Sequence, residues 1–317
     1  MARPSQGGTP LGDDGDGMRL LVFGARGQVA TELRRLAGGA PSVQAPSVQA
    51  LSVHALPRET ADLEDPAACA AVVAACHADA VVNAAAWTDV DGAEREEGRA
   101  TVVNAAAPGA IAAACAARGL PFLHLSTDFV FDGEADAPLD EDAPAAPLSA
   151  YGRSKLAGEA AVRAADPDAV ILRVTRVFAA HGANWVRAML RAAETRPVLR
   201  VVQDQISAPT AAADIAATLV RLAAARRRGA GAGGVYHYCA RPAVSMLDFT
   251  REIFRQADWA PQPRIAPSMT ADWPTPARRP LRPLLDCARI RAVFGVEQPD
   301  WRVSLAAVLS EIKELRP

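Results

Sequence analysis

Tyr151 and Lys155 stand four residues apart in a segment, residues 149–159, that reads SAYGRSKLAGE. If this segment is a helix, the two side chains leave it on one face, about one turn apart. A tyrosine hydroxyl can protonate a substrate oxygen, and a nearby ammonium stabilises the phenolate that the transfer leaves behind. The hydroxyl of Thr127, a little upstream, could hold the same oxygen in place. The pattern suggests general acid catalysis, and a surface tyrosine and lysine at helical spacing is the simpler alternative.

A glycine turn follows the first apolar run of the chain. Residues 19–23 (RLLVF) lead at once into GARGQVA, residues 24–30, and then into a helical pattern. In a strand, turn and helix of this kind, Gly24 would allow the tight turn and Gly27 would let the backbone approach a pyrophosphate. Small Ala30 would let the helix pack closely on the strand. The position of the turn favours a dinucleotide site, although glycine turns also join strands to helices without binding anything.

In a dinucleotide site, the residues at the end of the second strand determine whether NAD or NADP is bound. We expect that strand near residues 52–56, after a duplicated APSVQ motif at residues 40–49 that we interpret as a loop. An acid at the strand end would bind the ribose 2′-hydroxyl of NAD, whereas an arginine would accommodate the 2′-phosphate of NADP. No acid stands there and Arg58 lies just beyond, with Asp62 and Leu63 placed to hold the adenine edge. The pattern favours NADPH, with NADH possible, and an exposed loop arginine is the alternative.

Strands and helices alternate through the first half of the chain. This order is typical of an α/β fold of the Rossmann type, a doubly wound parallel sheet whose ligands bind at the carboxyl ends of the strands. Gly27, Ala86 and Thr127 each fall at the carboxyl end of a predicted strand, so we expect them on one edge. The strands are predicted at residues 80–83, 121–127 and 170–174, and the helices from residue 65, at 100–118 and from residue 151.

The division of the chain follows from these patterns. Residues 1–17 are rich in Gly, Asp and Pro and are predicted to form a disordered tail. Residues 18–180 are expected to form mainly the NAD(P)-binding domain, and residues 181–317 mainly a smaller C-terminal α/β substrate domain. Within the latter we predict a helix at 184–194, a strand at 197–202, a strand near 234–239 that returns to the Rossmann sheet, and a closing helix at 301–315.

Composition excludes several classes of protein. The net charge of −2 over 317 residues gives no reason to expect nucleic acid or a membrane surface as a partner. No apolar run approaches the ~20 residues that span a bilayer, and the N-terminus lacks a signal pattern, so we expect a cytoplasmic protein. The five cysteines are scattered without a C-x-x-C pair, which argues against a zinc site.

Taken together, these motifs resemble those of the extended short-chain dehydrogenase/reductases, and most closely the dTDP-4-dehydrorhamnose reductases. The resemblance covers nearly everything from Met18 onward. The shared motifs are FGARGQV (23–29), VNAAAWT (82–88), STDFVF (126–131), YGRSKLAGE (151–159), DQ with APT (204–205 and 208–210), PTPARRP (274–280) and PDW (299–301).

The resemblance implies NAD(P)H-dependent reduction of the C4 ketone of dTDP-4-dehydro-L-rhamnose to dTDP-L-rhamnose. Tyr151 would be the general acid, Lys155 would bind the nicotinamide ribose and lower the Tyr151 pKa, and Thr127 would hydrogen-bond the carbonyl or tune Tyr151. The sugar would also meet Asp128. The cofactor would contact these catalytic Tyr and Lys side chains and Gly24, Gly27, Gln28, Val29, Arg58, Asp62, Leu63, Ala86, Trp87 and Thr88.

The departures from the family pattern lie on the sugar side. Arg176 stands where relatives commonly carry an aromatic residue, and it could pair with a phosphate, bind a sugar hydroxyl or point to solvent. Residues 281–283 (LRP) replace a polar pair. Some members dimerise through a divalent metal held by acids. Here Glu32 matches one such position but Ala213 replaces another, so we expect no metal and a monomer or weak homodimer.

Two other functions stay open. The chain could be a 4-ketoreductase for another dTDP-deoxysugar of natural-product biosynthesis. It could also be a non-catalytic NADP-binding regulatory subunit, because a fold can host binding without chemistry. Such relatives tend to lose members of the catalytic trio, whereas Thr127, Tyr151 and Lys155 are all present here.

Overall fold

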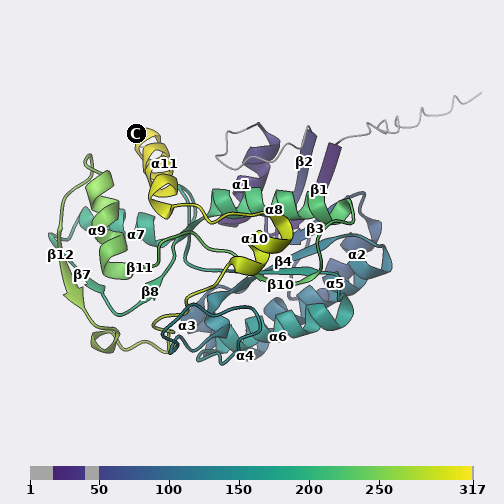
Figure 1. Cartoon of the computed structure of the whole chain (residues 1–317), viewed down its shortest axis with the longest axis horizontal. Coiled ribbons are helices and arrows are strands. Elements are labelled where there is room, and N and C mark those ends of the chain that lie inside the picture. The colour runs from purple at the N-terminus through teal and green to yellow at the C-terminus, as the bar shows by residue number, and fades with distance from the viewer. Residues whose placement is uncertain (1–16, 40–49, 316–317) are drawn as a thin grey trace, which may run out of the picture.

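A six-stranded, wholly parallel sheet forms the centre of the molecule (Figure 1). The computed structural model describes residues 17–39 and 50–315, so residues 1–16 of the predicted tail and the duplicated motif at 40–49 lie outside the described residues. The tail was predicted one residue too long, because Gly17 is already the first residue of the first strand. The strand order is β10-β5-β4-β3-β1-β2. The strands are β1 (Gly17–Phe23), β2 (Ala50–Leu56), β3 (Ala80–Asn83), β4 (Phe122–Thr127), β5 (Val170–Val174) and β10 (Gly234–His237).

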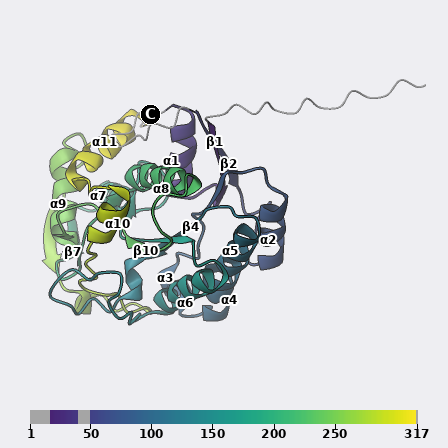
Figure 2. The same cartoon turned by 45° about the vertical axis from the view of Figure 1, so that its right-hand side comes forward.

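Helices cover both faces of this sheet (Figures 1 and 2). On one face α1 (Gln28–Ala37) packs against α8 (Ala212–Arg227), and on the other α2 (Pro66–Ala75), α5 (Ala107–Ala117) and α6 (Ala150–Ala165) pack in series. Each layer encloses its own apolar core, with Val22 and Leu33 in the first and Phe23 and Ile111 in the second. The predicted doubly wound α/β fold is confirmed. Because β2 and β3 flank β1, the carboxyl ends of β1 and β3 mark the switch point where ligands bind in such sheets.

The helix predicted at 100–118 begins earlier and is not uniform. It consists of α4 (Glu97–Thr101), the π-helical turn η1 (Val102–Ala106) and α5. Over Glu97–Ala117 it is long and apolar enough to cross a bilayer by length and composition alone. Our expectation that no stretch approached this length overlooked it, because alanines supply most of its apolar character and polar residues interrupt the run. In the fold it packs against α2 and α6 as a core helix of the sheet's second face.

The chain after β5 builds a smaller unit beside the sheet edge (Figure 1). Its core contains Phe178, Phe249 and Trp301, with the rings of Phe249 and Trp301 in edge-to-face contact at 5.3 Å. Three two-stranded sheets pair β8 with β11, β7 with β12, and β6 with β9. Its elements are β6 (Val177–Phe178), α7 (Trp185–Ala193), β7 (Val198–Val202), β8 (Ile206–Ser207), β9 (Thr210–Ala211), β11 (Val244–Ser245), α9 (Met246–Gln256), β12 (Arg264–Ser268), η3 (Thr270–Asp272) and α11 (Trp301–Glu314). The helix α10 (Ala288–Phe294) packs instead against β10, with Ile290 in the core of the sheet's first face.

Candidate active site

The glycine turn after β1 lies against the loop after β3. Gly24 has φ +97°, and a Cβ atom on it would stand 2.9 Å from the side chain of Ala85. Only glycine therefore fits between the two loops in this left-handed conformation. Gly27 follows as the N-cap of α1, where no side chain caps the helix. The first backbone N–H groups of α1 are thus left for another acceptor, as at an anion-binding helix end.

Asn104 fastens the loop after β3 to α6. Its side-chain oxygen accepts from the Trp87 backbone N–H at 2.8 Å, and its Nδ2 donates to the Trp87 carbonyl at 3.1 Å and to Ser154 Oγ at 2.9 Å. A Cβ atom on Gly158 would clash with the Asn104 carbonyl at 2.0 Å, so glycine permits the close approach of α6 and η1. This fixes the backbone of the Ala86–Thr88 segment. This role of Asn104 was not predicted, although an asparagine inside an apolar, alanine-rich helix is a signal that the sequence contains.

The side chain of Lys155 is buried and is hydrogen-bonded to β4 near the carboxyl end of that strand. Its side chain is 2% exposed, and Nζ donates to the Leu125 carbonyl at 2.7 Å. His124 Nε2 lies 3.4 Å from the same nitrogen, and His124 Nδ1 lies 3.1 Å from Asn83 Nδ2. Burial lowers the pKa of Lys155 to about 8. The relay from Asn83 through His124 to Lys155 was not predicted, because a histidine inside an apolar strand looks like an ordinary core residue.

Tyr151 lies one helical turn before Lys155 on α6, as the spacing predicted. Burial and the nearby Asp128 carboxylate raise the pKa of Tyr151 to about 12, and the hydroxyl of Thr127 beside it partly offsets this rise. The expected lowering of this pKa by Lys155 is not found. Lys155 Nζ is hydrogen-bonded to the Leu125 carbonyl, and desolvation is the largest influence on the pKa of the neutral Tyr151 phenol.

Asp128 is buried next to this hydroxyl pair. Thr127 Oγ1 donates to one carboxylate oxygen at 3.1 Å, and Thr175 Oγ1 donates to the other at 2.5 Å. Burial raises the pKa of Asp128, which these hydrogen bonds and the charge of Arg176 partly offset. Asp128 therefore orients Thr127, which in turn orients Tyr151.

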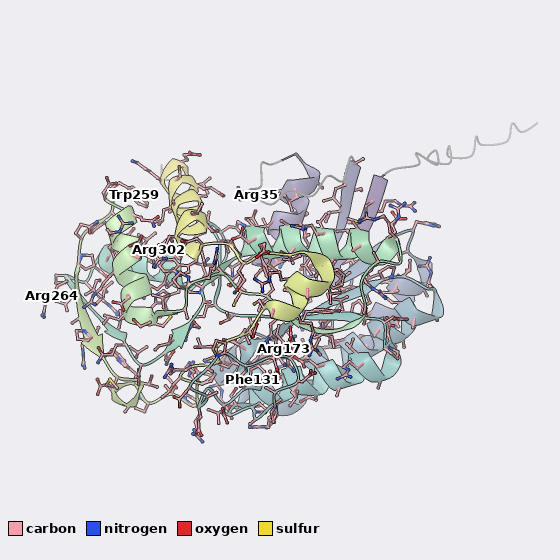
Figure 3. All side chains as sticks on the ribbon, in the orientation of Figure 1. Arg35, Phe131, Arg173, Trp259, Arg264 and Arg302 are labelled. Atoms are coloured by element: carbon pink, nitrogen blue, oxygen red, sulfur yellow. The ribbon has the colours of Figure 1, made fainter. Side chains whose placement is uncertain are left out.

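A buried ion pair supports the strands beneath the site. Arg173 on β5 and Glu159 on α6 form two hydrogen bonds of 2.7 and 2.9 Å, and their side chains are 5% and 4% exposed. Ser126 Oγ donates to the same carboxylate at 2.5 Å, and His237 Nε2 lies 3.2 Å from Arg173 Nη1. The guanidinium also lies 5.0 Å from the ring centre of Phe131 (Figure 3). The network joins α6 to three neighbouring strands, β4, β5 and β10.

Several predicted cofactor residues already have partners within the chain. Arg58 is exposed and donates to Asp62 at 3.0 Å and to Glu64 at 2.5 Å. Leu63 is buried in the core below them. The side-chain oxygen of Gln28 accepts from Asn184, the N-cap of α7, at 3.0 Å. Arg58 and Asp62 therefore form one ion pair, and the Gln28 side chain joins α1 to the smaller unit.

Arg176 lines a cleft of about 420 Å³ between the sheet edge and the smaller unit. The side chain is half-buried, donates through Nε to Ser207 Oγ at 2.5 Å and through Nη2 to Gln205 Oε1 at 3.0 Å. The alternative in which Arg176 simply points to solvent is therefore wrong, because these two acceptors hold the guanidinium in the cleft. Phe129, which follows the Thr127 motif, lines the same cleft.

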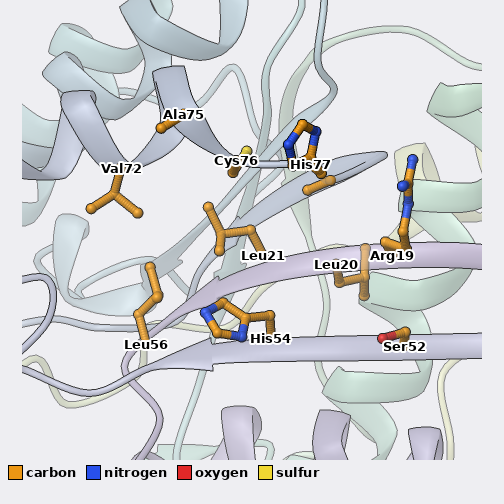
Figure 4. Close-up of a pocket in the computed structure, with 11 residues that line it drawn as sticks. Arg19, Leu20, Leu21, Ser52, His54, Leu56, Val72, Ala75, Cys76 and His77 are labelled. Carbon is orange, nitrogen blue, oxygen red and sulfur yellow. The ribbon is translucent and has the colours of Figure 1, made fainter. Parts of the chain in front are cut away.

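A second cavity, of about 490 Å³, lies beside β1, β2 and the end of α2 (Figure 4). Its lining includes Leu21, His54 and Cys76, and it contains none of the site residues predicted from the sequence. The candidate active site is therefore the carboxyl edge of the sheet together with the cleft around Arg176.

Glu32, which matches a metal-binding position of some relatives, is paired within the chain. Arg35 Nη1 donates to Glu32 at 3.1 Å and Arg35 Nη2 to Glu311 at 2.5 Å, while His181 Nε2 lies 2.6 Å from Glu32. Figure 3 shows Arg35 on α1. Among residues 17–39 and 50–315, no group of three or more His, Cys, Asp or Glu side chains could hold a metal ion.

Comparison with known proteins agrees with this geometry. The family model described as the RmlD substrate binding domain matches residues 18–314. A curated dTDP-4-dehydrorhamnose reductase of Burkholderia thailandensis is 42% identical over 307 residues, covering 93% of this chain and 99% of the relative. The chain belongs to the dTDP-4-dehydrorhamnose reductase family. The Escherichia coli member is 36% identical over 302 residues, covering 93% of this chain and 98% of the relative.

Solved structures of this family have the same fold. The dTDP-4-dehydrorhamnose reductase of Clostridium acetobutylicum has a TM-score of 0.84 at 30% identity, covering 93% of this chain and 100% of that one. That of Bacillus anthracis, solved in complex with NADP, also has a TM-score of 0.84, at 26% identity, and covers 93% and 99%. The resemblance to the family inferred from the motifs is confirmed.

Proposed function

We propose that this chain is an NADPH-dependent oxidoreductase that reduces the C4 ketone of dTDP-4-dehydro-L-rhamnose to dTDP-L-rhamnose. The observation that carries the proposal is the convergence of Tyr151, Thr127 and Lys155 at the edge that holds the glycine turn. Membership of a family whose named members are dTDP-4-dehydrorhamnose reductases supports the substrate. The NADP complex of the Bacillus anthracis relative supports the cofactor, with NADH as the alternative.

The cofactor, when bound, supplies the hydride. The tight contact of Gly24 with Ala85 and the uncapped start of α1 leave backbone N–H groups for its pyrophosphate. We assign the pyrophosphate to the backbone of Gly24, Gly27, Gln28 and Val29, the adenosine side to Arg58, Asp62 and Leu63, and the nicotinamide side to Ala86, Trp87, Thr88, Tyr151 and Lys155.

Tyr151 is the proton donor in this proposal. Its pKa of about 12 keeps the phenol protonated at neutral pH, so the acid form is present when the ketone oxygen gains charge. Thr127 holds the Tyr151 hydroxyl and, with Asp128, faces the sugar. Lys155, whose pKa is about 8, is mostly an ammonium at pH 7 and stabilises the phenolate through space once it forms.

The two parts of the chain are assigned to different ligands. We assign residues 18–180 mainly to cofactor binding and 181–317 mainly to the sugar nucleotide, with Arg176 at their boundary. β10 pairs in parallel with β5, which returns the later chain to the sheet. We further propose a soluble, cytoplasmic monomer or weak homodimer, a reading that the packing of the apolar 97–117 helix against α2 and α6 supports.

The test is the purified chain with dTDP-4-dehydro-L-rhamnose, followed by the loss of NADPH or NADH absorbance. We expect oxidation of NADPH and formation of dTDP-L-rhamnose. Assays across other dTDP-4-keto-6-deoxysugars compare kcat/KM, and a higher value for another epimer would replace the rhamnose assignment. Tight NADPH binding without turnover of any keto-sugar would favour the regulatory subunit.

A further inference from the structure

Three arginines line the cleft, and two of them are neutralised by acids. Arg200 pairs with Asp272 at 3.2 Å, and Arg279 pairs with Asp91 at 2.6 Å. Arg176 forms no ion pair within the described part of the chain, although it is half-buried and desolvation lowers the pKa of its guanidinium. The cleft thus holds one guanidinium whose charge has no partner at contact distance.

The backbone at Arg176 is held in an unfavourable conformation. Its φ is +40°, and among the described residues it is the one non-glycine with a positive φ. Side chains other than glycine, asparagine and aspartate avoid this region. Such a conformation persists only where the surroundings impose it, and it occurs preferentially at ligand-binding positions.

The contacts of the side chain leave part of its hydrogen-bonding capacity open. Nε and Nη2 donate to the neutral acceptors Ser207 and Gln205, and Nη1 has no partner among the described residues. Arg176 lines the cleft and is only half-buried, so part of its side chain faces the cleft. Asp128 attracts the guanidinium from farther away, but its oxygens accept from Thr127 and from Thr175.

An enclosed cation without an ion pair is costly, and an anion that enters the cleft would offset that cost. A guanidinium matches the oxygens of a phosphate group with two parallel hydrogen bonds. The walls of the cleft also carry aromatic rings, from Phe129, Trp185 and Trp273, which suit the planar or apolar parts of a nucleotide sugar.

We propose that Arg176 binds the diphosphate of a nucleoside diphosphate sugar, and that it makes the cleft select for the diphosphate group of the substrate. This inference rests on the proposed function, because in a dTDP-sugar the diphosphate is the anionic group. Gln205 and Ser207 are positioning residues that aim the guanidinium. Arg176 thus binds the nucleotide end of the substrate, away from the proton donor Tyr151.

Calorimetric titration with dTDP tests the inference without turnover. The first variant is Arg176→Asn, since asparagine tolerates the left-handed backbone. We expect it to bind dTDP roughly 10- to 100-fold more weakly than the parent, the range for hydrogen bonds to charged groups. Its affinities for thymidine and for NADPH should be unchanged. Arg251→Asn, at an exposed ion pair on α9, is the control and should match the parent.

Each outcome decides the question. Equal dTDP affinity in the parent and Arg176→Asn would overturn the inference, as would a loss confined to NADPH, which would assign Arg176 to the cofactor. If Arg176→Asn does not fold, Arg176→Lys decides, because lysine keeps the charge but lacks the planar fork. It should bind dTDP about tenfold more weakly, and parent-like affinity would contradict the proposal. Ketone reduction by the parent is measured separately and tests the proposed function alone.

Discussion

The two sides of the candidate active site are built differently. At the sheet edge Lys155 and the Glu159–Arg173 pair are buried, and hydrogen bonds within the chain satisfy them. In the cleft Arg176 has a positive φ, and its Nη1 has no hydrogen-bond partner among the described residues. The difference teaches that the proton-transfer machinery is organised before any ligand arrives. The substrate contacts, in contrast, are completed by the ligand itself.

The substitution Tyr151→Phe, at the sheet edge, has the largest expected effect. It removes the proton donor, so we expect kcat to fall ~10²–10⁴-fold while NADPH affinity changes little. Steady-state assays and cofactor titration measure the two quantities. If the variant keeps more than about a tenth of the parent kcat, Tyr151 is not the proton donor.

Arg173→Met tests whether the network below the site is structural. It leaves the Glu159 carboxylate buried without its cation, so the free energy of unfolding should fall by about 3–5 kcal/mol. Urea unfolding measures this, with Arg251→Met as the matched control. That exposed pair with Asp248 should lose only about 0.2–1 kcal/mol. Equal losses would mean that the buried network contributes no more than a surface pair.

The pH dependence of kcat/KM reports on Lys155. The ammonium is present below its pKa of about 8 and is lost as the pH rises through that value. We expect kcat/KM to decline above pH 8, approaching tenfold per unit, while Tyr151 stays protonated because its pKa is about 12. Lys155→Arg keeps a cation throughout this range, so its remaining activity should show no such decline. A parent profile that is flat to pH 10 would contradict the assignment.

Arg58→Ala tests the cofactor preference with a smaller effect. Arg58 is exposed and already paired with Asp62 and Glu64, so its attraction for a 2′-phosphate is screened. We expect KM for NADPH to rise only about fivefold or less, as for an exposed and solvent-screened charge, with KM for NADH unchanged. Equal changes for both cofactors would show that Arg58 does not select between them.

Chelation of metals should have no effect. Arg35 donates to both Glu32 and Glu311, so an internal cation already neutralises these carboxylates. The elution volume in size-exclusion chromatography should be the same with EDTA and with magnesium. A shift to a dimer on adding magnesium would show that the ion displaces Arg35.

The sheet-edge side of the site was predicted better than the cleft, because the motifs at the sheet edge are local in sequence. The Tyr151–Lys155 spacing, the glycine turn and the strand ends each depend on a few consecutive residues and on the general rule for parallel sheets. The relay from Asn83 through His124 to Lys155 needs the register of β3 against β4, which only the fold supplies. The lysine was therefore predicted, but not its orientation toward β4.

The cleft was predicted less well, because its contacts join distant segments. Arg176 meets Gln205 and Ser207 across about 30 positions of sequence, and no local pattern indicates that they are its acceptors. Its positive φ is also invisible to a pattern, since an arginine is not expected in that region.

The central claim is that one sheet edge brings a hydride and the Tyr151 proton to the same carbonyl group. The direct measurement is a single turnover with dTDP-4-dehydro-L-rhamnose and NADPH deuterated at the transferring C4 position. The predicted result is deuterium at C4 of dTDP-L-rhamnose, formed by the parent and formed ~10²–10⁴-fold more slowly by Tyr151→Phe with NADPH bound. Binding of NADPH by the parent without any transfer of deuterium to the sugar would contradict the account.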